Sequence, residues 1–368
     1  MIQTALMPDV SSFETDYRSS RELFLEWARR RGATLRAYRN PNRGPSGEEL
    51  VTDVAWVGEA DADRVLVTIS ATHGVEGFCG SGCQVDWLRY LPDPPKGVAV
   101  LHVHALNPHG FAWLRRVTEE GVDLNRNHVD FDKPIPQNPG YTELADALIP
   151  EALEGAPYDA ALAKLSAYEA KHGTRALRRA QTGGQYTDRK GLFYGGDAPT
   201  WSRRTNEAVM ADFDIKRRSL VCLVDYHTGL GPYGYGEAMV SDEVGTRPET
   251  YASAWFGESL TNTALGNTSS DALFGFVEDG WKALLGDRAV CITLEYGCFD
   301  YSVTWGSLVR EQWHHLHRHN AAWDDPETVA VKTYLRRAFH PDTPSWKELV
   351  LFRSRQILGQ ATAGLAAA

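Results

Sequence analysis

The sequence has few cysteines and no long hydrophobic run, and both absences exclude whole classes of protein. Its five cysteines are an odd number among 368 residues and form no pair of CxxC motifs, which argues against a disulfide framework and a cysteine zinc site. No stretch reaches the roughly 18 consecutive apolar residues of a membrane span, and the N-terminus has no basic segment followed by an apolar one. We therefore expect reduced thiols and a cytoplasmic protein without membrane contacts.

Positive charge is also in short supply. Lys and Arg total 38 against 48 for Asp and Glu, which gives a formal net charge of -10. A chain of this charge repels nucleic-acid phosphates and anionic lipid surfaces, so we expect neither as a partner. Hydrophobic residues make up 43% of the sequence, which is ordinary for a globular protein with a large buried core.

Four short apolar runs, rich in β-branched residues, are typical of strands buried on both faces of a sheet. They cover 64–71, 98–106, 220–224 and 289–294. A helical pattern at 84–90 separates the first two runs, as in a parallel sheet with a crossover helix. The pattern predicts one α/β domain over residues 1–368, whose central twisted sheet is mixed, largely parallel and flanked by helices.

The remaining chain contains helical and glycine-rich segments. An alanine-rich helical pattern within about 135–215 predicts a helical insertion between the second and third runs. The segment 229–236, GLGPYGYG, is expected to be a loop, and residues 303–360 are expected to be mostly helical. No repeat or low-complexity linker marks a domain boundary, so we expect one domain with insertions.

Polar residues that suit metal chemistry follow three of the apolar runs. His73 and Glu76 follow the first, His227 follows the third and Glu295 follows the fourth. Ligands bind beyond the carboxyl ends of the strands in open α/β sheets, so these side chains can converge there. Two imidazoles and a carboxylate suit a catalytic Zn²⁺ that keeps a position for water. Glu295 would then accept a proton from that water, and Asp123 or Asp225 could orient a ligand histidine.

Each residue also has a structural explanation when it is considered alone. An isolated HxxE pair is more often accidental than metal-binding, and His227 could simply be hydrogen-bonded within its loop. Glu295 could cap a helix or pair with an arginine. The shared position at strand ends is what favours the zinc site.

The segment 121–127, GVDLNRN, places an amide beside a guanidinium. This pair suits bidentate binding of a substrate carboxylate, although an arginine paired with a structural aspartate is the alternative. Together with HGVEG, NPHGF, DYHTG and LEYG, in chain order, this motif resembles the carboxypeptidase A-like zinc carboxypeptidase clan. The resemblance covers about 60–300 and is strongest to the bacterial zinc carboxypeptidase-like branch of that clan.

The resemblance implies a role for individual residues. One Zn²⁺ per chain would be held by His73, Glu76 and His227, with Glu295 as general base. Further implied roles belong to Asn125 and Arg126 as carboxylate binders, to Asp123 as the partner of His73, and to Arg116 or, less favoured, Arg115 as the oxyanion stabiliser. The DYHTG context differs from the HSY context of digestive carboxypeptidases. The mobile tyrosine of the clan has three candidates here, Tyr194, Tyr233 and Tyr235.

The expected function is zinc-dependent hydrolysis of an amide bond adjacent to a free carboxylate, as in a metallocarboxypeptidase. The substrate would be a small peptide or an N-acyl amino acid, and an aspartoacylase-like N-acyl amino acid deacylase is the alternative. A binding module without catalytic activity is the second alternative.

Other histidine and glycine motifs favour structural explanations. His102 and His104 on an apolar strand are expected to be hydrogen-bonded core residues rather than metal ligands. Glu311 and His314 form an ExxH motif, but a carboxylate-bridged di-metal site needs a second such motif, so a solvated helix face is expected. The sequence contains no GxSxG elbow and no P-loop, which disfavours a serine hydrolase and a nucleotide-binding enzyme.

Overall fold

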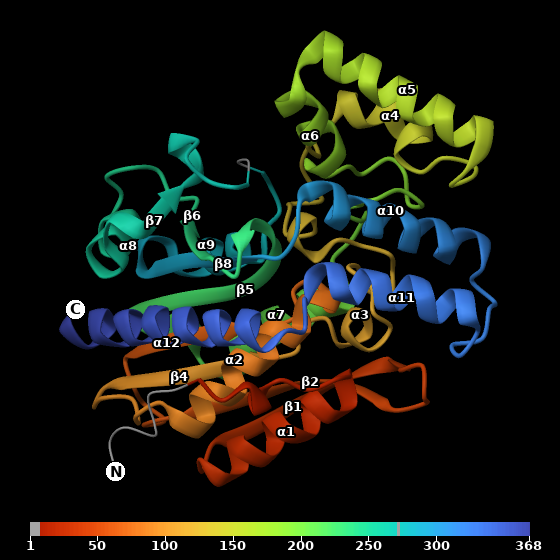
Figure 1. The fold of residues 1–368 in the computed structure, drawn as a ribbon. Coiled ribbons are helices and arrows are strands. Elements are labelled where there is room, and N and C mark those ends of the chain that lie inside the picture. Colours follow the sequence, from red (N-terminus) through yellow and green to blue (C-terminus); the bar gives the residue numbers. More distant parts are fainter. Residues whose placement is uncertain (1–7, 271–272) are drawn as a thin grey trace.

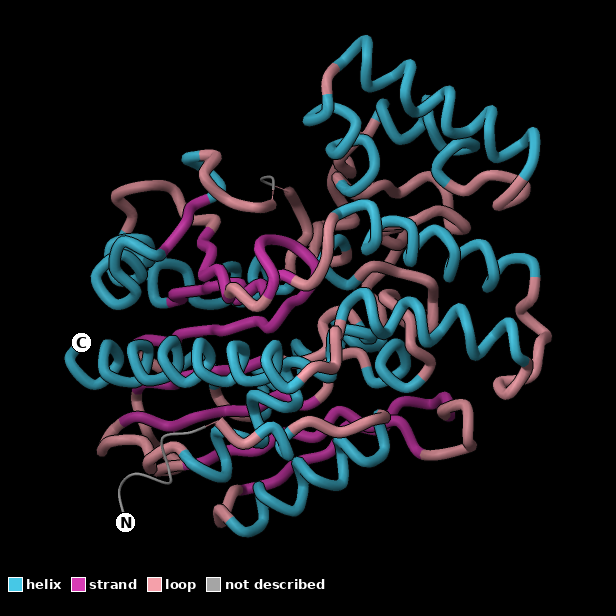
Figure 2. The backbone as a smooth tube through the Cα atoms, viewed as in Figure 1, coloured by secondary structure: helices cyan, strands magenta, loops and turns pink. Residues whose placement is uncertain are grey.

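A computed structural model describes residues 8–270 and 273–368. Its central feature is one eight-stranded sheet with the order β1-β2-β4-β3-β5-β8-β6-β7 (Figures 1 and 2). The four central strands run parallel to one another and correspond to the four predicted runs. They are β4 (Val98–His104), β3 (Arg64–Ile69), β5 (Leu220–Tyr233) and β8 (Ala289–Gly297).

Both edges of the sheet contain antiparallel pairs, which confirms the mixed, largely parallel sheet. At one edge, β2 pairs antiparallel with β4 and with β1. At the other edge, β6 pairs antiparallel with β8 and parallel with β7. The sequence patterns did not predict these outer strands, which are β1 (Thr34–Arg43), β2 (Glu49–Val57), β6 (Gly236–Val240) and β7 (Leu260–Asn262).

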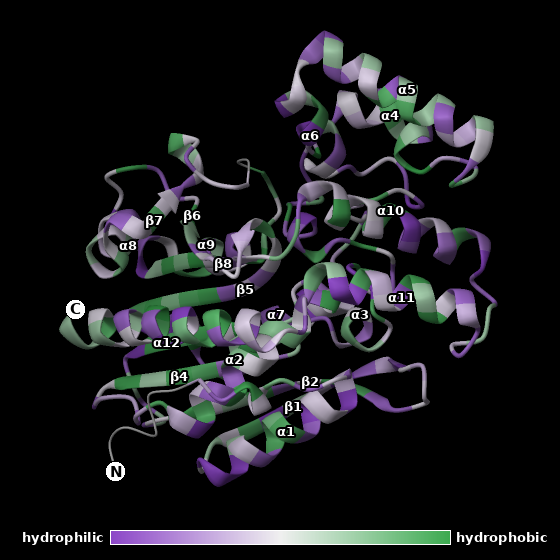
Figure 3. Ribbon diagram, in the orientation of Figure 1, coloured by the Kyte–Doolittle hydropathy of each residue, from purple (hydrophilic) through white to green (hydrophobic). Residues whose placement is uncertain are grey.

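Helices cover both faces of the sheet, and this explains why the central strands are continuously apolar. Along β3, Leu66 packs into one hydrophobic layer, whereas Val65 and Val67 pack into the other. Figure 3 shows the apolar colouring concentrated on these strands. The first layer contains α1 (Tyr17–Arg30), α2 (Gly77–Tyr90), α8 (Arg247–Phe256) and α12 (Pro344–Ala367), and the second contains α7 (Trp201–Asp212) and α9 (Val277–Leu285).

Short helices and two long ones gather at the carboxyl end of the parallel strands. Val75, which follows β3, packs with Leu308, Leu335 and Phe339 of the two long helices. The turn that carries His73 and Glu76 is therefore clamped by apolar contacts. The elements here are η2 (Gly74–Glu76), α3 (Pro108–Ala112), η3 (Leu124–Arg126), α10 (Tyr301–His317) and α11 (Pro326–Phe339).

The predicted helical insertion lies between β4 and β5 and has two parts. Its first three helices form a separate group beside α10 (Figure 1), with a small core of their own around Tyr141, Leu144 and Ala180. Its last helix, α7, packs Val209 and Met210 against the sheet. The three outer helices are α4 (Pro139–Leu148), α5 (Gly155–His172) and α6 (Thr174–Thr182). Short turns complete the chain at η1 (Val10–Ser12), η4 (Ile215–Arg217), η5 (Gly257–Ser259), η6 (Thr263–Leu265) and η7 (Gly286–Arg288).

The prediction of a loop over 229–236 is wrong, because β5 continues to Tyr233 and β6 begins at Gly236. His227 lies opposite Glu295 in the register of β5 and β8, so both residues lie inside the ladder rather than beyond it. The apolar run ends near Val224 because Asp225, His227 and Thr228 are polar, although they stay buried and the backbone pairing with β8 continues. The glycines permit a register shift between Thr228 and Tyr233, where Gly229 has a φ of 128°.

Candidate metal centre and active site

The turn after β3 is held in place by its backbone as well as by apolar contacts. The N–H of Gly74 donates to the carbonyl of Arg116 at 3.1 Å, and the N–H of Val75 donates to that of Arg115 at 2.9 Å. A side chain at Gly74 would place its Cβ 2.0 Å from the backbone of Gly110. Only glycine allows this close approach, so the local sequence fixes where His73 and Glu76 stand.

Three predicted ligands converge into a group that we call the metal centre, made of His73, Glu76 and His227. The Nδ1 atoms of the two histidines are 3.1 Å apart. Oε1 of Glu76 lies 3.0 Å from Nδ1 of His73, and its Oε2 lies 3.2 Å from Nδ1 of His227. Tetrahedral zinc with bonds of about 2.0–2.1 Å requires ligand atoms about 3.3 Å apart. The donor types and their spacing therefore fit one Zn²⁺.

Carboxylates orient both imidazoles from behind. Nε2 of His73 lies 3.1 Å from Oδ1 of Asp123, and Nε2 of His227 lies 2.9 Å from Oδ2 of Asp225. Thr72 in turn donates a hydrogen bond of 2.7 Å to Asp225. A carboxylate that accepts the second ring N–H is the usual support of a metal-binding histidine, since it leaves the other nitrogen available to the metal.

The metal centre is buried and has an excess of negative charge. Burial opposes the charge on Glu76, but His73 and His227 lower its pKa below the ordinary value. Burial likewise opposes the charge on His227, yet Asp225 and Glu76 raise its pKa well above the ordinary value. Without a cation the site thus favours a protonated imidazole. A divalent cation would replace that proton, because metal binding requires neutral imidazole.

Glu295 reaches the same cavity as the metal centre. Its Oε1 accepts a hydrogen bond of 3.0 Å from the N–H of Leu230. Burial and the nearby carboxylate of Glu76 raise the pKa of Glu295 to about 8. A carboxyl group with a raised pKa can both accept and return a proton near neutral pH, which suits the predicted role of general base.

The three arginines of the predicted site have different partners. Arg116 donates to Oδ2 of Asp123 at 2.9 Å and to Oε1 of Glu76 at 3.2 Å, so it neutralises carboxylates beside the metal centre. Arg115 points elsewhere and pairs with Glu311, which rules it out as the alternative oxyanion stabiliser. Arg126 is buried and donates to the backbone carbonyls of its neighbour Asn125 and of Thr182, both at 2.7 Å.

The carboxylate-binding pair keeps hydrogen-bonding capacity toward the cavity. Oδ1 of Asn125 accepts the N–H of Val277 at 2.9 Å, and its Nδ2 lies 3.3 Å from Nε2 of His227. Among residues 8–270 and 273–368, no carboxylate accepts a hydrogen bond from the guanidinium of Arg126, and its Nε–H has no hydrogen-bond partner. Both side chains line the cavity.

The structure answers the remaining structural expectations. His102 bonds to Thr68 at 2.7 Å and His104 to Ser81 at 2.8 Å, both fully buried, as expected for core histidines. The solvated face predicted around Glu311 is wrong. Glu311 is buried and accepts hydrogen bonds from Arg115 and Lys332, while Arg115 also donates to Gln312. We call these four residues the Arg115 cluster.

None of the three candidate tyrosines lines the cavity, and another one does. Tyr194 is buried, Tyr233 bonds to Thr343 and Tyr235 is exposed. Tyr301, at the start of α10, lines the cavity together with Arg178 of α6. Neither residue carries a local sequence signal, since the contact joins two segments more than 120 positions apart in the chain.

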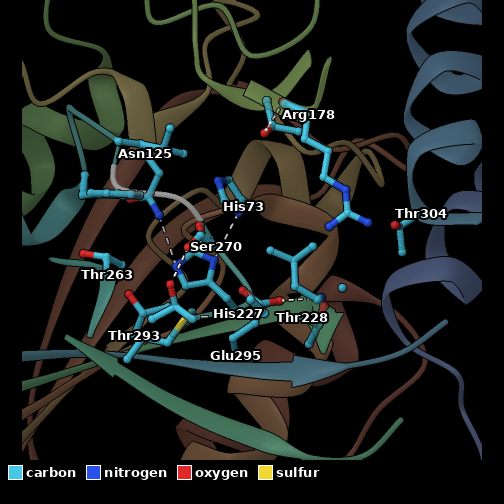
Figure 4. A pocket seen from close by; sticks show the side chains of 18 of the residues that line it. His73, Asn125, Arg178, His227, Thr228, Thr263, Ser270, Thr293, Glu295 and Thr304 are labelled. Carbon is cyan, nitrogen blue, oxygen red and sulfur yellow. Dashed lines mark hydrogen bonds between the residues drawn. The ribbon is translucent and has the colours of Figure 1, made fainter. Parts of the chain in front are cut away.

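The cavity itself has a volume of about 590 Å³, within the range of small-molecule sites. Figure 4 shows His73, His227 and Glu295 at its centre, Asn125 on one side and Arg178 on the other. Hydroxyl side chains line the wall near Asn125, among them Thr263, Ser270 and Thr293.

The fold and the site define an α/β protein in which two histidines and a glutamate are arranged as the ligands of a metal ion. The chain belongs to the DUF2817 family, whose model, described as "Protein of unknown function (DUF2817)", matches residues 13–353. No curated protein matches it in sequence. Among the described residues, no helix has the length and apolar character to cross a membrane.

Comparison with solved structures finds matches of low sequence identity. Murein-tripeptide amidase MpaA from Escherichia coli O157 is 18% identical, with a TM-score of 0.38 over 78% of this chain and 94% of that one. An aspartoacylase family protein from Mesorhizobium loti is 14% identical, with a TM-score of 0.39 over 77% of this chain and 67% of that one. Thrombin activatable fibrinolysis inhibitor is 10% identical, with a TM-score of 0.47 over 99% of this chain and 80% of that one. These similarities are loose, so the chemistry below rests on the site alone.

Proposed function

We propose that the protein is a zinc-dependent hydrolase that cleaves an amide bond next to a free carboxylate. The observation that supports this most is the spacing of 3.0–3.2 Å among the donor atoms of His73, Glu76 and His227. This spacing occurs at the centre of a cavity that also contains a buried carboxyl group, Glu295. Metal ligands and a proton acceptor together are what hydrolysis by an activated water requires.

Zinc held by this donor set would supply Lewis acidity, which polarises a carbonyl and lowers the pKa of water from 15.7 to about 7. Glu295 accepts the proton from the attacking water and then delivers it to the leaving amine. Its pKa of about 8 belongs to the site without a cation. Positive charge nearby favours the ionised carboxylate, which is the form that acts as a base.

The protein's own side chains position the substrate. Arg126 and Asn125 both line the cavity, and an amide beside a guanidinium is suited to a carboxylate. In the proposed mechanism, this contact sets which amide bond lies over the metal centre. Arg116, whose guanidinium already contacts Glu76 and Asp123, stabilises the negative charge that develops on the carbonyl oxygen.

The cavity favours a small substrate over a long peptide. A volume of about 590 Å³ holds a small molecule, and the insertion helix α6 forms part of the wall. We therefore place an N-acyl amino acid or a short peptide ahead of a protein C-terminus. An N-acyl amino acid deacylase remains the second candidate activity, because it uses the same proton acceptor and carboxylate contacts.

The direct test is hydrolysis of paired substrates by the zinc-loaded protein. N-acyl amino acids and dipeptides with a free carboxylate are compared with their C-terminally amidated twins, with and without a chelator. We expect turnover of the free acids, its loss on chelation, and a fall of at least about tenfold in kcat/KM for the amidated twins, since a charged hydrogen bond is lost.

The pattern of turnover distinguishes the candidate functions. Preference for dipeptides supports the peptidase, whereas preference for acylated amino acids supports the deacylase. Equal turnover of free and amidated substrates would contradict the carboxylate contact. Retention of zinc without hydrolysis of any substrate would favour a binding module.

A further inference from the structure

The insertion helix α6 faces the active-site cavity with one side. Its cavity-lining residues are Thr174, Arg175, Arg178 and Thr182. Thr174, Arg178 and Thr182 follow one another at intervals of four residues, which places them on one face of the helix. The intervening Arg179 does not line the cavity. The insertion therefore forms part of the site that the central sheet builds, although it lies far from the metal ligands in sequence.

Two hydrogen bonds fix the end of α6 to the rest of the site. Arg126 donates to the carbonyl of Thr182 at 2.7 Å. The hydroxyl of Tyr301, on α10, donates to Oε1 of Gln181 at 2.8 Å. Gln181 is buried, so this contact is shielded from water. The position of α6 is thus tied to the predicted carboxylate binder on one side and to α10 on the other.

Arg178 is held by an aromatic ring. Its guanidinium carbon lies 4.9 Å from the centre of the Tyr301 ring. Stacking on a ring uses the flat face of a guanidinium and leaves its N–H edges available for a planar anion. Among residues 8–270 and 273–368, no carboxylate forms an ion pair of 4 Å or less with Arg178. The tyrosine orients this charge without neutralising it.

The location of Arg178 separates it from the predicted carboxylate contact at the scissile bond. Figure 4 shows the side chain of Arg178 reaching into the cavity, whose lining also includes Thr304. Asn125 lies on the opposite side, and the histidines of the metal centre lie between the two. A substrate whose carboxylate binds at Asn125 and Arg126 would therefore extend its other half past the metal centre toward Arg178.

We propose that Arg178 binds a second anionic group of the substrate, on the acyl side of the scissile amide. This inference rests on the proposed function and narrows its substrate class. The preferred substrate is an amide with a carboxylate on each side of the bond, such as an amino acid acylated by a dicarboxylic acid or by an acidic residue. The insertion then acts as a specificity element rather than as a source of catalytic groups.

The test compares acyl groups that differ in charge but closely match in length. N-succinyl- and N-glutaryl-L-alanine carry a terminal carboxylate, whereas N-butyryl- and N-pentanoyl-L-alanine end in a methyl group. Binding to the zinc-loaded Glu295→Gln chain is measured by calorimetry, and kcat and KM are measured with the wild-type chain. We expect at least one acidic probe to bind about tenfold or more tightly than its neutral twin, as a charged hydrogen bond predicts.

Variants on α6 assign that preference to one residue. Arg178→Ala should abolish the preference and leave the neutral probes unaffected, whereas Arg178→Lys should retain part of it. Arg179→Ala is the matched control, one residue further along the helix and outside the cavity lining, and should behave as wild type. Circular dichroism checks that each variant keeps its helices.

The outcomes separate this inference from the proposed function. Hydrolysis of all four probes at equal efficiency would overturn the role of Arg178 and keep the hydrolase. A binding preference lost in Arg178→Ala, without hydrolysis of any probe, would keep the anion site and overturn the hydrolase. The inference is overturned if the acidic and neutral probes of both pairs bind with equal affinity, or if none of them binds. It is also overturned if Arg178→Ala keeps the preference for the acidic probes.

Discussion

Two buried polar clusters begin at adjacent residues, Arg115 and Arg116, and they differ in how their charges are balanced. In the Arg115 cluster, Glu311 contacts Arg115 at 2.9 Å and Lys332 at 2.6 Å, so one carboxylate has two cations. Around the metal centre, Arg116 contacts Glu76 and Asp123. Asp225 and Glu295 form no ion pair with a lysine or arginine in the described part of the chain.

The difference shows which of the two buried clusters has enough positive charge to balance its carboxylates. Both are buried and both contain short polar contacts, so burial and hydrogen bonding alone do not distinguish structure from function. In the Arg115 cluster, Arg115 and Lys332 both contact Glu311, and they lower the pKa of Glu311 to about 2 against the opposing effect of burial. Beside the metal centre, Asp225 and Glu295 have no lysine or arginine paired with them among the described residues, and a divalent cation would supply the missing positive charge.

The largest expected effect follows from removing Glu295, the proposed proton acceptor beside the metal centre. Glu295→Gln should lower kcat by about 10²- to 10⁴-fold, because an amide cannot accept the proton. Zinc content should stay at the wild-type value, since Glu295 is not a proposed ligand. Steady-state kinetics and metal analysis measure both, with the exposed Glu258→Gln as control. Unchanged turnover would remove Glu295 from the mechanism.

Breaking the Arg115 cluster should affect stability and leave the metal in place. Glu311→Gln leaves Arg115 and Lys332 buried without their carboxylate, which should cost about 3–5 kcal/mol of unfolding free energy. The control is Glu327→Gln, which breaks an exposed pair with Arg318 and should cost about 1 kcal/mol or less. Urea unfolding measures both variants. Loss of zinc from Glu311→Gln at unchanged stability would contradict the division into two clusters.

The carboxylate behind His227 should tune metal affinity. Asp225→Asn keeps an acceptor for the ring N–H but removes the negative charge, and we expect zinc affinity to fall about 10- to 100-fold. Competition with a chromogenic chelator measures the dissociation constant. The exposed Asp214→Asn serves as control. An affinity equal to that of wild type would show that Asp225 does not support the metal centre.

Glu119 belongs to neither cluster, and its replacement is expected to have the smallest effect of the variants considered. It tests how a partly buried carboxyl group behaves when its hydrogen-bond partner is uncharged. Glu119 is partly buried, and its Oε1 accepts a hydrogen bond from the uncharged Asn40. Burial and the neighbouring Glu120 raise the pKa of Glu119 from 4.5 to about 7. A raised carboxyl pKa stabilises the fold below the unfolded value of 4.5, and this stability is lost as the pH rises through about 7.

Replacing Glu119 should therefore change the pH dependence of stability. Relative to wild type, Glu119→Gln should gain unfolding free energy between pH 5 and pH 8, on the order of 1–2 kcal/mol given its partial exposure. Urea unfolding at both pH values, with the exposed Glu243→Gln as control, measures the gain. A parallel pH dependence in wild type and Glu119→Gln would contradict the pKa shift.

The centre of the fold could be predicted from the sequence, but its edges could not. Strands β3, β4, β5 and β8 are apolar on both faces, and this leaves a continuous signal. Strand β1 is largely exposed and β7 has three residues, so neither forms a comparable run. The end of β5 resembled a loop because it is rich in glycine and contains a proline, yet its pairing with β8 resumes at Tyr233 after a register shift.

The residues of the candidate site likewise fall into those that the sequence could predict and those that it could not. The residues His73, Glu76, His227 and Glu295 could be predicted to converge because each follows an apolar run of the sequence, and these runs lie side by side in the sheet. Arg178 could not, because its place in the cavity depends on how the insertion docks through Gln181 and Thr182. Its sequence context, one arginine among several on an exposed helix, resembles an ordinary solvated surface.

The most direct test of the metal centre is zinc analysis of the purified chain and of the His73→Ala/His227→Ala double variant, by mass spectrometry after loading and gel filtration. His172→Ala, on the exposed face of α5, controls for adventitious binding to histidine. We predict one zinc per chain in wild type and in the control, and none in the double variant. Zinc retained by the double variant, or absent from the loaded wild type, would contradict the account.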